Sequence, residues 1–469
     1  MINQIIFSFI MYFAVLVGIG LFFYSRSKNA GSFLVANRSL NYWVTAIAAQ
    51  SSDMGSWLFL GYPAVVFLHG SIKIWVAVGL VIFMYLNWLL IAAKLRTATE
   101  RYRSFTLPTF FERRFDDASG VLRMLSAIVA LFFFLLYLAA GLVGLGTLFE
   151  SVFHISYYTG ILIGTAITVA YILIGGFFAV AWCNLFQGIF LMVMIVTVPL
   201  YALHIMGGAN SIYTQATIQG ISLHFIPTDI SSLLLILFNI ASFGLGYFGQ
   251  PHILVNFMSI DNVDNVKNAT RVGITWQILV LAAASAIGLI GIGYFQHGIN
   301  NPEHIFVQMT TDLFPPLLAG FVLCAILAAA LSTINTQLLV AAGNFAEDIY
   351  PKFAHRTITS HHLVNVSRGA TVIIALLAML IAYNIRSTIY DLVLYAWSGL
   401  GSAFGPLVIA ALYYKQPTRQ GAIAGLITGS CIGLMWPFFN TSIPTLVPGL
   451  GISMVVIIAV SMITGTNQR

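Results

Sequence analysis

The sequence has little charge and few cysteines. Only 7% of its 469 residues are Asp, Glu, Lys or Arg, whereas 59% are hydrophobic. Because a water-soluble fold cannot hide so large an apolar fraction, the composition indicates a polytopic membrane protein. Cys183, Cys324 and Cys431 lie far apart in apolar segments. This spacing excludes a disulfide framework or a metal motif, and we expect three small buried residues there.

Catalytic motifs are also missing. No nucleophile and base are paired within the apolar segments, so we expect no enzymatic activity. The ten histidines fall mostly in loops or at the ends of apolar segments, without the spacing of a metalloprotease helix. The formal charge of +6 does not indicate a nucleic-acid partner, because in a membrane protein the distribution of charge reports topology. We expect no obligatory protein partner either.

The sequence contains many long apolar runs. Runs of about 20 apolar residues, each long enough to cross a bilayer, recur about thirteen times. No linker or soluble-domain-sized loop interrupts them, so we expect one all-α transmembrane domain over residues 1–469. The first run, residues 5–24, lacks the basic start of a signal peptide and predicts a retained helix.

Basic residues gather in alternate loops. On this reading 18 of the 20 Lys and Arg residues fall on one side, with Lys73 and Arg386 on the other. Because basic loops stay in the cytoplasm, the pattern predicts an N-terminus outside the cell and a C-terminus inside.

The second and seventh apolar segments resemble interrupted helices. Residues 50–63 read QSSDMGSWLFLGYP and residues 239–251 read NIASFGLGYFGQP, and both end in Gly-x-Pro. Glycine and polar residues weaken a membrane helix, and the freed backbone groups are tolerated where they line a polar cavity. Paired broken helices five segments apart are typical of transporters built from inverted repeats. The alternative is that these glycines only allow close helix packing.

Asp53 is the one acidic residue near the middle of an apolar segment. Its burial costs about 2.5 to 3.5 kcal/mol on insertion scales, so a compensating group is expected. No Lys or Arg lies mid-segment, which leaves a bound cation or a proton.

The ninth segment supplies oxygen atoms for such a cation. Ala329, Ser332, Thr333 and Thr336 share one helix face. Hydroxyl and carbonyl oxygens without a carboxylate cluster favour a monovalent ion over calcium or magnesium. Alternatively, these hydroxyls bond back to their own helix, as is common in membranes.

Several consecutive motifs carry a family resemblance. These are SDMGSWLFLGYPAVVF, TLPTFFERRF, YFGQPHILVNFM, ILAAALSTINTQLLV and YAWSGLGSAFGPLV. In this order they resemble the sodium/solute symporter family, and within it the bacterial sodium/proline symporters, over essentially the whole chain.

The resemblance implies a LeuT-like core of two inverted five-helix repeats among thirteen helices. It implies sodium-coupled uptake of a small amino acid, L-proline first, by alternating access in a bacterial inner membrane. The implied sodium ligands are Ser51, Met54, Ala329, Ser332 and Thr333. The implied coupling residues are Asp53 and Arg38. The implied substrate-binding residues are Gly55, Ser56, Trp57, Tyr137, Phe243, Tyr247 and Thr336.

The chain departs from the family pattern at four places. Gly55-Ser56 stands where Ser-Gly is usual, Phe243 replaces a tryptophan, Thr336 replaces a cysteine, and Cys183-Asn184 replaces Thr-Asp. The last change favours one sodium ion per substrate. The others keep open a different solute, such as pantothenate, another amino acid or a small carboxylate. Proton coupling is a further alternative, and a membrane sensor or channel is the alternative from another class.

Overall fold

A computed structural model describes residues 2–24, 30–226, 230–354, 359–385, 387–439 and 441–466. These residues form helices and connecting loops, with one isolated parallel bridge between Leu40 and Ile260. Five basic residues used in the orientation argument lie outside the described residues: Arg26, Lys28, Arg356, Arg386 and Arg469.

The helices follow one another along the chain with short connections. The first half contains α1 (Ile2–Tyr24), α2 (Ala30–Val35), η1 (Ala36–Arg38), α3 (Tyr42–Ser51), η2 (Ser56–Leu58), α4 (Gly61–His69), η3 (Gly70–Lys73), α5 (Ile74–Leu86), η4 (Asn87–Ala92), α6 (Ala93–Arg101), α7 (Leu107–Arg114), α8 (Val121–Phe153), α9 (Tyr157–Ile205) and α10 (Asn210–Gln219). The second half contains α11 (Ile230–Gly244), η5 (Leu245–Gly249), α12 (Pro251–Ser259), η6 (Val263–Asn265), α13 (Val266–Tyr294), η7 (Pro302–His304), α14 (Ile305–Leu313), α15 (Pro316–Asn344), η8 (Phe345–Ile349), α16 (Tyr350–Phe353), α17 (Ser360–Asn384), α18 (Ile389–Tyr413), α19 (Arg419–Met435), η9 (Trp436–Phe439) and α20 (Leu446–Thr466).

Among the described residues, fewer helices are long and apolar enough to cross a membrane than the thirteen predicted. Within the described residues, ten helices are long and apolar enough to cross a bilayer, or eleven if a bent pair counts as one span. The expected second span is divided between α3 and α4, which have 10 and 9 residues and are each too short to cross alone. Gly176, with φ of 60°, interrupts α9, and the apolar helix before it covers only Tyr157–Ala170. Thirteen spans therefore stays a prediction.

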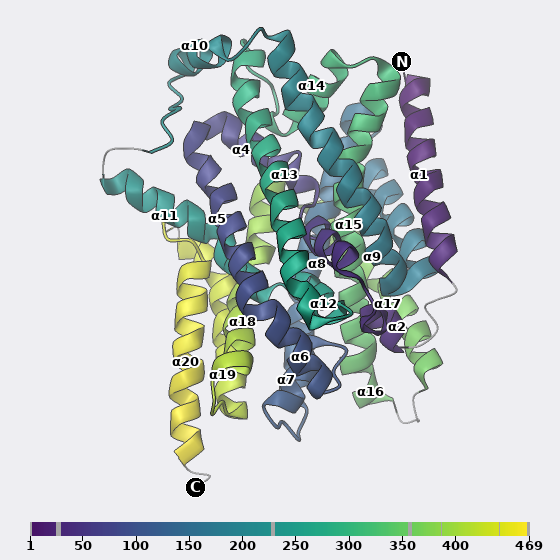
Figure 1. Cartoon of the computed structure of the whole chain (residues 1–469), viewed down its shortest axis with the longest axis vertical. Coiled ribbons are helices and arrows are strands. Elements are labelled where there is room, and N and C mark those ends of the chain that lie inside the picture. The colour runs from purple at the N-terminus through teal and green to yellow at the C-terminus, as the bar shows by residue number, and fades with distance from the viewer. Residues whose placement is uncertain are drawn as a thin grey trace.

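The termini lie at opposite ends of the molecule (Figure 1). The start of α1 lies at the end that carries α10 and α14, whereas α20 finishes at the end that carries α6, α7 and α16. Helix α15 runs through the centre, packed against α1, α8 and α9. It is the most buried span, with 83% of its apolar window inside the protein.

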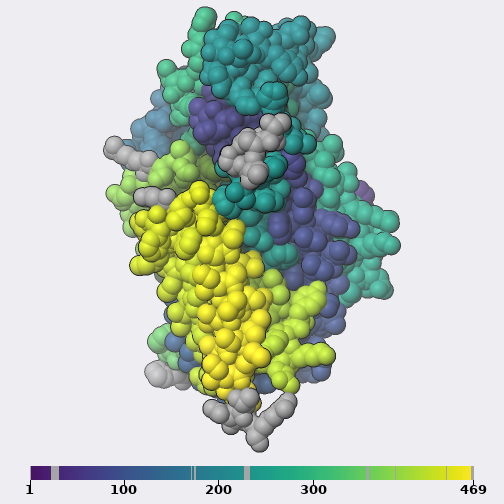
Figure 2. Space-filling view, turned by 90° about the vertical axis from the view of Figure 1, so that its left-hand side faces the viewer, coloured from purple at the N-terminus to yellow at the C-terminus, as the bar shows by residue number. Residues whose placement is uncertain are grey.

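The outer surface is apolar, as lipid contact requires. In Figure 2, α20 covers the lower part of one side, where Val455 is 64% and Met462 is 63% exposed. Neighbouring α19 packs against α18 and α20 and turns Cys431 outward. The expectation of three buried cysteines is therefore correct for Cys183 and Cys324 and wrong for Cys431.

The first helix break follows directly from its sequence. The Asn41 side chain caps α3 by accepting the Val44 amide at 3.0 Å. Helix α3 ends at Ser51, the chain is extended at Gly55, and α4 begins at Gly61 with Pro63 in its first turn. Proline suits that position because it has no amide hydrogen to donate.

The second break has the same order of parts. Helix α11 passes into the short η5, and α12 restarts at Pro251 with a bend of 51°. A side chain on Gly249 would approach the Gly405 amide nitrogen to 2.4 Å, so α18 packs directly on the backbone there. Both breaks thus lie inside the protein, where their free backbone groups face other helices.

Candidate functional site

Oxygen atoms of α3 and α15 converge where α3 ends. The Ser332 hydroxyl donates to the Ser51 carbonyl oxygen at 2.7 Å and lies 3.0 Å from the Ala329 carbonyl oxygen. The Thr333 hydroxyl lies 3.3 Å from the same Ser51 oxygen. Four of the five predicted sodium ligands therefore contribute oxygen atoms to one buried cluster.

The fifth predicted ligand, Met54, lies three residues beyond Ser51 in the same break and is fully buried. Next to it, a side chain on Gly55 would come within 3.3 Å of the Thr333 hydroxyl. Side chains of α15 therefore lie directly against the backbone of the break. The described residues contain no group of three or more His, Cys, Asp or Glu that could hold a metal ion. The neutral oxygen cluster is thus the arrangement that fits a hard monovalent cation.

Asp53 joins the two broken helices. Its carboxylate accepts a hydrogen bond from the Tyr247 hydroxyl of η5 at 2.5 Å. That hydroxyl accepts from the Gln277 amide of α13 at 2.9 Å, and the Gln50 amide donates to Gln277 at 3.3 Å. Asp53 is 1% exposed, and no Lys, Arg or His of the described residues forms an ion pair with it. Within the described residues, the Asp53 carboxylate is therefore held by this chain of hydrogen bonds.

Three of the predicted substrate residues form an aromatic wall beside Asp53. Trp57 stacks on Phe243 with ring centroids 5.6 Å apart and planes 14° from parallel. The Trp57 indole also donates to the Asp53 carbonyl oxygen at 3.1 Å. Tyr247 meets Trp397 of α18 edge-on at 5.1 Å. The indole of Trp397 donates in turn to the Phe243 carbonyl oxygen at 2.7 Å, so α18 holds the wall in place.

Unpartnered polar atoms also lie around Trp397. Tyr137 and His252 both pack on its ring, at 6.4 Å each, and are 5.7 Å from one another. The Tyr137 hydroxyl and both His252 nitrogens are buried without a hydrogen-bond partner among the described residues. Native interiors rarely leave such atoms unsatisfied, and a bound ligand is one explanation.

Ser56 and Thr336 lie apart from the aromatic wall. Ser56 packs so closely on α8 that a side chain on Gly144 would come 2.1 Å from its hydroxyl. The Thr336 hydroxyl donates to the Ser332 carbonyl oxygen at 2.9 Å and accepts from the Asn184 amide at 2.8 Å. Thr336 therefore contacts α9 and its own helix, as the back-bonding alternative expected.

Arg38 lies at the end of the molecule near the C-terminus and contacts none of the other predicted site residues. Its guanidinium donates to the Thr99 hydroxyl and to the carbonyl oxygens of Thr99, Met258 and Ser104, at 2.8 to 3.0 Å. Burial, together with nearby Arg96, lowers the Arg38 pKa to about 10, so the group stays charged near neutral pH.

Backbone hydrogen bonds also connect the residues before α3 with the end of α12. The Leu40 amide donates to the Ser259 carbonyl oxygen at 3.1 Å, and the Asp261 amide donates to the Leu40 carbonyl oxygen at 2.9 Å. We call these contacts and those of Arg38 the Arg38 clasp. The clasp ties the start of α3 to the end of α12, so it joins both broken helices at one end of the molecule.

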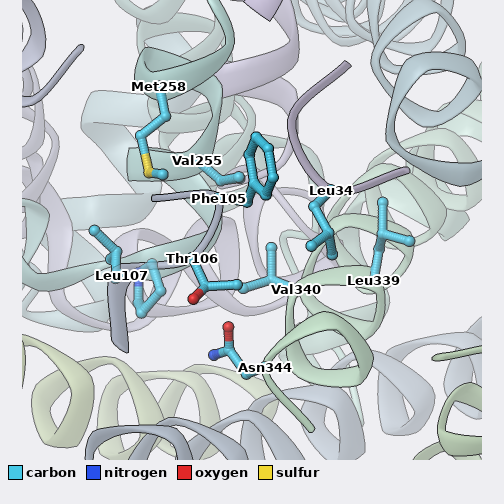
Figure 3. A pocket seen from close by; sticks show the side chains of 10 residues that line it. Leu34, Phe105, Thr106, Leu107, Val255, Met258, Leu339, Val340 and Asn344 are labelled. Atoms are coloured by element: carbon cyan, nitrogen blue, oxygen red, sulfur yellow. The ribbon is translucent and has the colours of Figure 1, made fainter. Parts of the chain in front are cut away.

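The space beside the clasp is nearly filled. A cavity of about 20 Å³ lies between α2, α12, α15 and the loop before α7. Figure 3 shows Leu34, Phe105, Val255 and Leu339 around it. That volume holds about one water molecule, so the side chains around this cavity pack closely.

Sequence reasoning missed several residues that shape the site. They are Gln50, His252, Gln277 and Trp397. The two glutamines are polar residues inside long apolar segments, which is a signal that a search beyond acidic residues would have found. His252 follows the Gly-x-Pro end of the second break, and Trp397 is an aromatic residue in an apolar helix; neither carries a periodic signal.

Comparison with known proteins identifies the family. The sequence model of the "Sodium:solute symporter family" matches residues 33–429. The high-affinity proline transporter PutP of Bacillus subtilis is 39% identical over 452 residues, which cover 95% of each chain. The osmoregulated proline transporter OpuE of the same organism is 38% identical, over 98% of this chain and 95% of that protein. The sodium/proline symporter of Escherichia coli is 36% identical, over 97% of this chain and 92% of that protein.

Solved structures agree on the fold. A sodium-coupled sialic acid symporter in a substrate-bound outward-open state superposes with a TM-score of 0.82 at 17% identity, over 98% of each chain. MhsT in complex with L-phenylalanine superposes with a TM-score of 0.59 at 15% identity, over 89% of this chain and 97% of that one. The predicted LeuT-like, all-α membrane fold is thus confirmed, and the matched family is one of transporters rather than enzymes. The chain is a multi-pass membrane protein that belongs to the sodium:solute symporter family.

Proposed function

We propose that the protein takes up L-proline together with sodium by alternating access. The buried oxygen cluster between α3 and α15 is the observation that carries this proposal, because it fits a monovalent cation and lies at a helix break. The proline transporters among the relatives motivate the choice of solute. Sodium is here a co-substrate that crosses the membrane, rather than a resident cofactor.

The sodium ion would be held by five residues: Ser51, Met54, Ala329, Ser332 and Thr333. Three backbone carbonyls and two hydroxyls make a neutral oxygen set, which suits a singly charged ion. Because these ligands come from two helices, a bound ion would fasten the first break to α15. Binding of sodium would then favour the arrangement that holds the substrate, and the substrate would raise sodium affinity by the same factor.

The substrate would lie against the aromatic wall. Trp57, Phe243 and Tyr247 offer apolar surface for a proline ring, and the backbone of Gly55 and Ser56 borders the same break. The unpartnered atoms of Tyr137 and His252 are suited to the polar groups of an amino acid, which adds His252 to the predicted residues. Thr336 is better explained as a support for Asn184 than as a direct contact.

Asp53 would couple the two breaks. Its hydrogen bond to Tyr247 links the sodium side of the site to the substrate side, so either ligand can influence the other through this residue. Release on the opposite side requires that the Arg38 clasp open and that the chains around the small cavity separate. Arg38 would thus act as a latch far from the bound ligands.

The position of the termini supports the predicted orientation. With α6, α7 and their basic residues at the end where α20 finishes, we infer that this end faces the cytoplasm and that the N-terminus lies outside. We further propose that the chain is one domain in a bacterial inner membrane. Asn184 has a neutral amide, which donates to Thr336, where the family pattern has a carboxylate. The missing negative charge favours a single sodium ion per substrate.

Transport by the purified protein in proteoliposomes tests this function. We expect labelled L-proline to accumulate under an inward sodium gradient and not under a proton gradient alone. Uptake driven by protons in sodium-free buffer would support the proton-coupled alternative. Lack of proline uptake, with sodium-driven uptake of pantothenate, another amino acid or a small carboxylate, would reassign the solute. A saturable sodium requirement would exclude a channel or a sensor.

A further inference from the structure

A wide pocket lies at the end of the molecule where α20 finishes. It has a volume of about 610 Å³ and is bordered by α6, the last residue of α7, η6 and the end of α18. Figure 1 shows α6 and α7 at this end, which was inferred above to face the cytoplasm. Lys94, Thr97 and Arg101 border the pocket and are exposed, so a ligand can enter it from the surface.

The charged side chains that border this pocket are basic. They are Lys94, Arg101 and Arg114, and none of the described residues that border it is acidic. Glu100 lies next to Arg101 in sequence but forms an ion pair with Arg96 at 2.7 Å. The pocket, which we call the basic pocket, therefore has three positive charges without a counter-charge in its lining and attracts anions.

Two of the three cations have donors left for a ligand. Within the described part of the chain, no hydrogen bond or ion pair occupies the Arg101 guanidinium. The Lys94 ammonium lies 3.9 Å from the centre of the Tyr413 ring, a contact that holds it over the ring without using its N–H groups on an acceptor oxygen. Arg114, in contrast, donates to the Ala411 carbonyl oxygen at 2.7 Å and stabilises the end of α18.

Apolar side chains beside the basic pocket place it at the edge of the bilayer. Leu89 and Leu90 of η4, in the helical turn before α6, are exposed, as lipid contact requires. The exposed Tyr413 donates its hydroxyl to the Leu90 carbonyl oxygen at 2.7 Å. Tyrosine is enriched where a membrane protein passes from acyl chains to headgroups. The lipid-facing surface therefore ends where the basic pocket begins.

We propose that the basic pocket binds the headgroup of an anionic phospholipid. The phosphate oxygens would contact Lys94 and Arg101, and the acyl chains would lie along Leu89 and Leu90. An anionic headgroup is favoured over a zwitterionic one, because the positive group of a zwitterion would meet three like charges. The inference goes beyond the proposed transport function and does not depend on the identity of the solute.

Native mass spectrometry of the purified full-length protein tests this site. The protein in a neutral detergent is titrated with phosphatidylglycerol, which is anionic, or with phosphatidylcholine, which is zwitterionic. We expect the first phosphatidylglycerol to bind about five-fold more tightly than the first phosphatidylcholine. The double variant Lys94→Gln/Arg101→Gln should lose this preference, whereas Lys94→Arg/Arg101→Lys keeps both charges and should retain it.

The matched control removes two charges outside the pocket. Lys267→Gln/Arg271→Gln changes two exposed basic residues of α13 that do not border the pocket, and it should keep the preference. Equal melting temperatures of the variants and the wild type check that all of them are folded. Inorganic phosphate in large excess should not displace the lipid, because it lacks the acyl chains.

Three results would overturn the proposal. The first is a preference for phosphatidylglycerol that persists in Lys94→Gln/Arg101→Gln, and the second is an equal loss in the control pair, which would indicate attraction by overall charge. The third is displacement by inorganic phosphate, which would assign the pocket to a soluble anion. Proline uptake by the wild type is measured separately, and its absence would overturn the proposed function without affecting the lipid site.

Discussion

At the scale of single residues, the buried carboxylate of Asp53 is the most unusual group. We expect Asp53→Asn to lower sodium-dependent proline uptake by about 10- to 100-fold, because it removes the charge that links Tyr247 to the ion site. Initial rates in proteoliposomes at fixed sodium concentration measure this. Asp312→Asn, an exposed acid on α14, is the matched control and should retain normal rates. Full activity of Asp53→Asn would refute a coupling role.

The two hydroxyls of α15 make a second residue-scale prediction. Ser332→Ala and Thr333→Ala should each raise the sodium concentration for half-maximal uptake about ten-fold, as expected for a lost contact to a charged group. Thr371→Ala is the control, because that buried hydroxyl only donates to the Ser367 carbonyl oxygen within α17. An equal effect of all three changes would mean that the Ser332 and Thr333 hydroxyls stabilise their helix and do not bind sodium.

His252 allows a test of the substrate side. His252→Phe keeps a ring of similar size but removes two unpartnered nitrogens. We expect the KM for L-proline to rise about ten-fold with little change in kcat, since a hydrogen bond to a charged substrate is lost. His252→Gln retains hydrogen-bonding atoms and should recover part of the affinity. If KM is the same in both variants and the wild type, His252 only fills space.

At the scale of helices, the contact between the first break and α8 depends on Gly144. Gly144→Ala would place a methyl group against Ser56, and we expect it to destabilise the protein by about 1 to 3 kcal/mol and to reduce uptake. Gly18→Ala lies in α1 with no atom within 4 Å of the added carbon. That control should leave uptake unchanged and should not lower the melting temperature, since alanine favours a helix more than glycine does. Equal melting temperatures for the two variants would contradict the close contact.

The helix breaks were predictable, whereas much of the surrounding network was not. Glycine, proline and Asp53 mark the breaks in the sequence, and helical spacing puts Ala329, Ser332 and Thr333 on one face. The pairing of those oxygens with Ser51 followed from the resemblance. Contacts between distant single residues, such as Gln277 with Tyr247, have no local pattern. Apolar length alone also does not predict how a segment folds, because the expected second span is divided between the short helices α3 and α4.

At the scale of the whole molecule, the proposed transport of one sodium ion with one zwitterion would be electrogenic. We expect one positive charge to enter per proline and sodium activation to be hyperbolic, with a Hill coefficient of about one. An interior-negative potential of about 100 mV would supply about 2.3 kcal/mol per charge, enough for roughly 50-fold accumulation. Parallel measurement of current and labelled proline on supported membranes gives the ratio. Two charges per proline would require a second cation site despite Asn184.

The Arg38 clasp has a consequence for how this protein can change during evolution. Three of the four acceptors that Arg38 uses are main-chain carbonyl oxygens, which every amino acid supplies. The Leu40 contacts to Ser259 and Asp261 are likewise main-chain bonds. Residues such as Met258 and Ser104 can therefore vary without loosening the joint, while Arg38 has no equivalent, because lysine lacks the planar fork of donors. Among descendants of this protein, we expect the residues around Arg38 to vary and Arg38 itself to be retained.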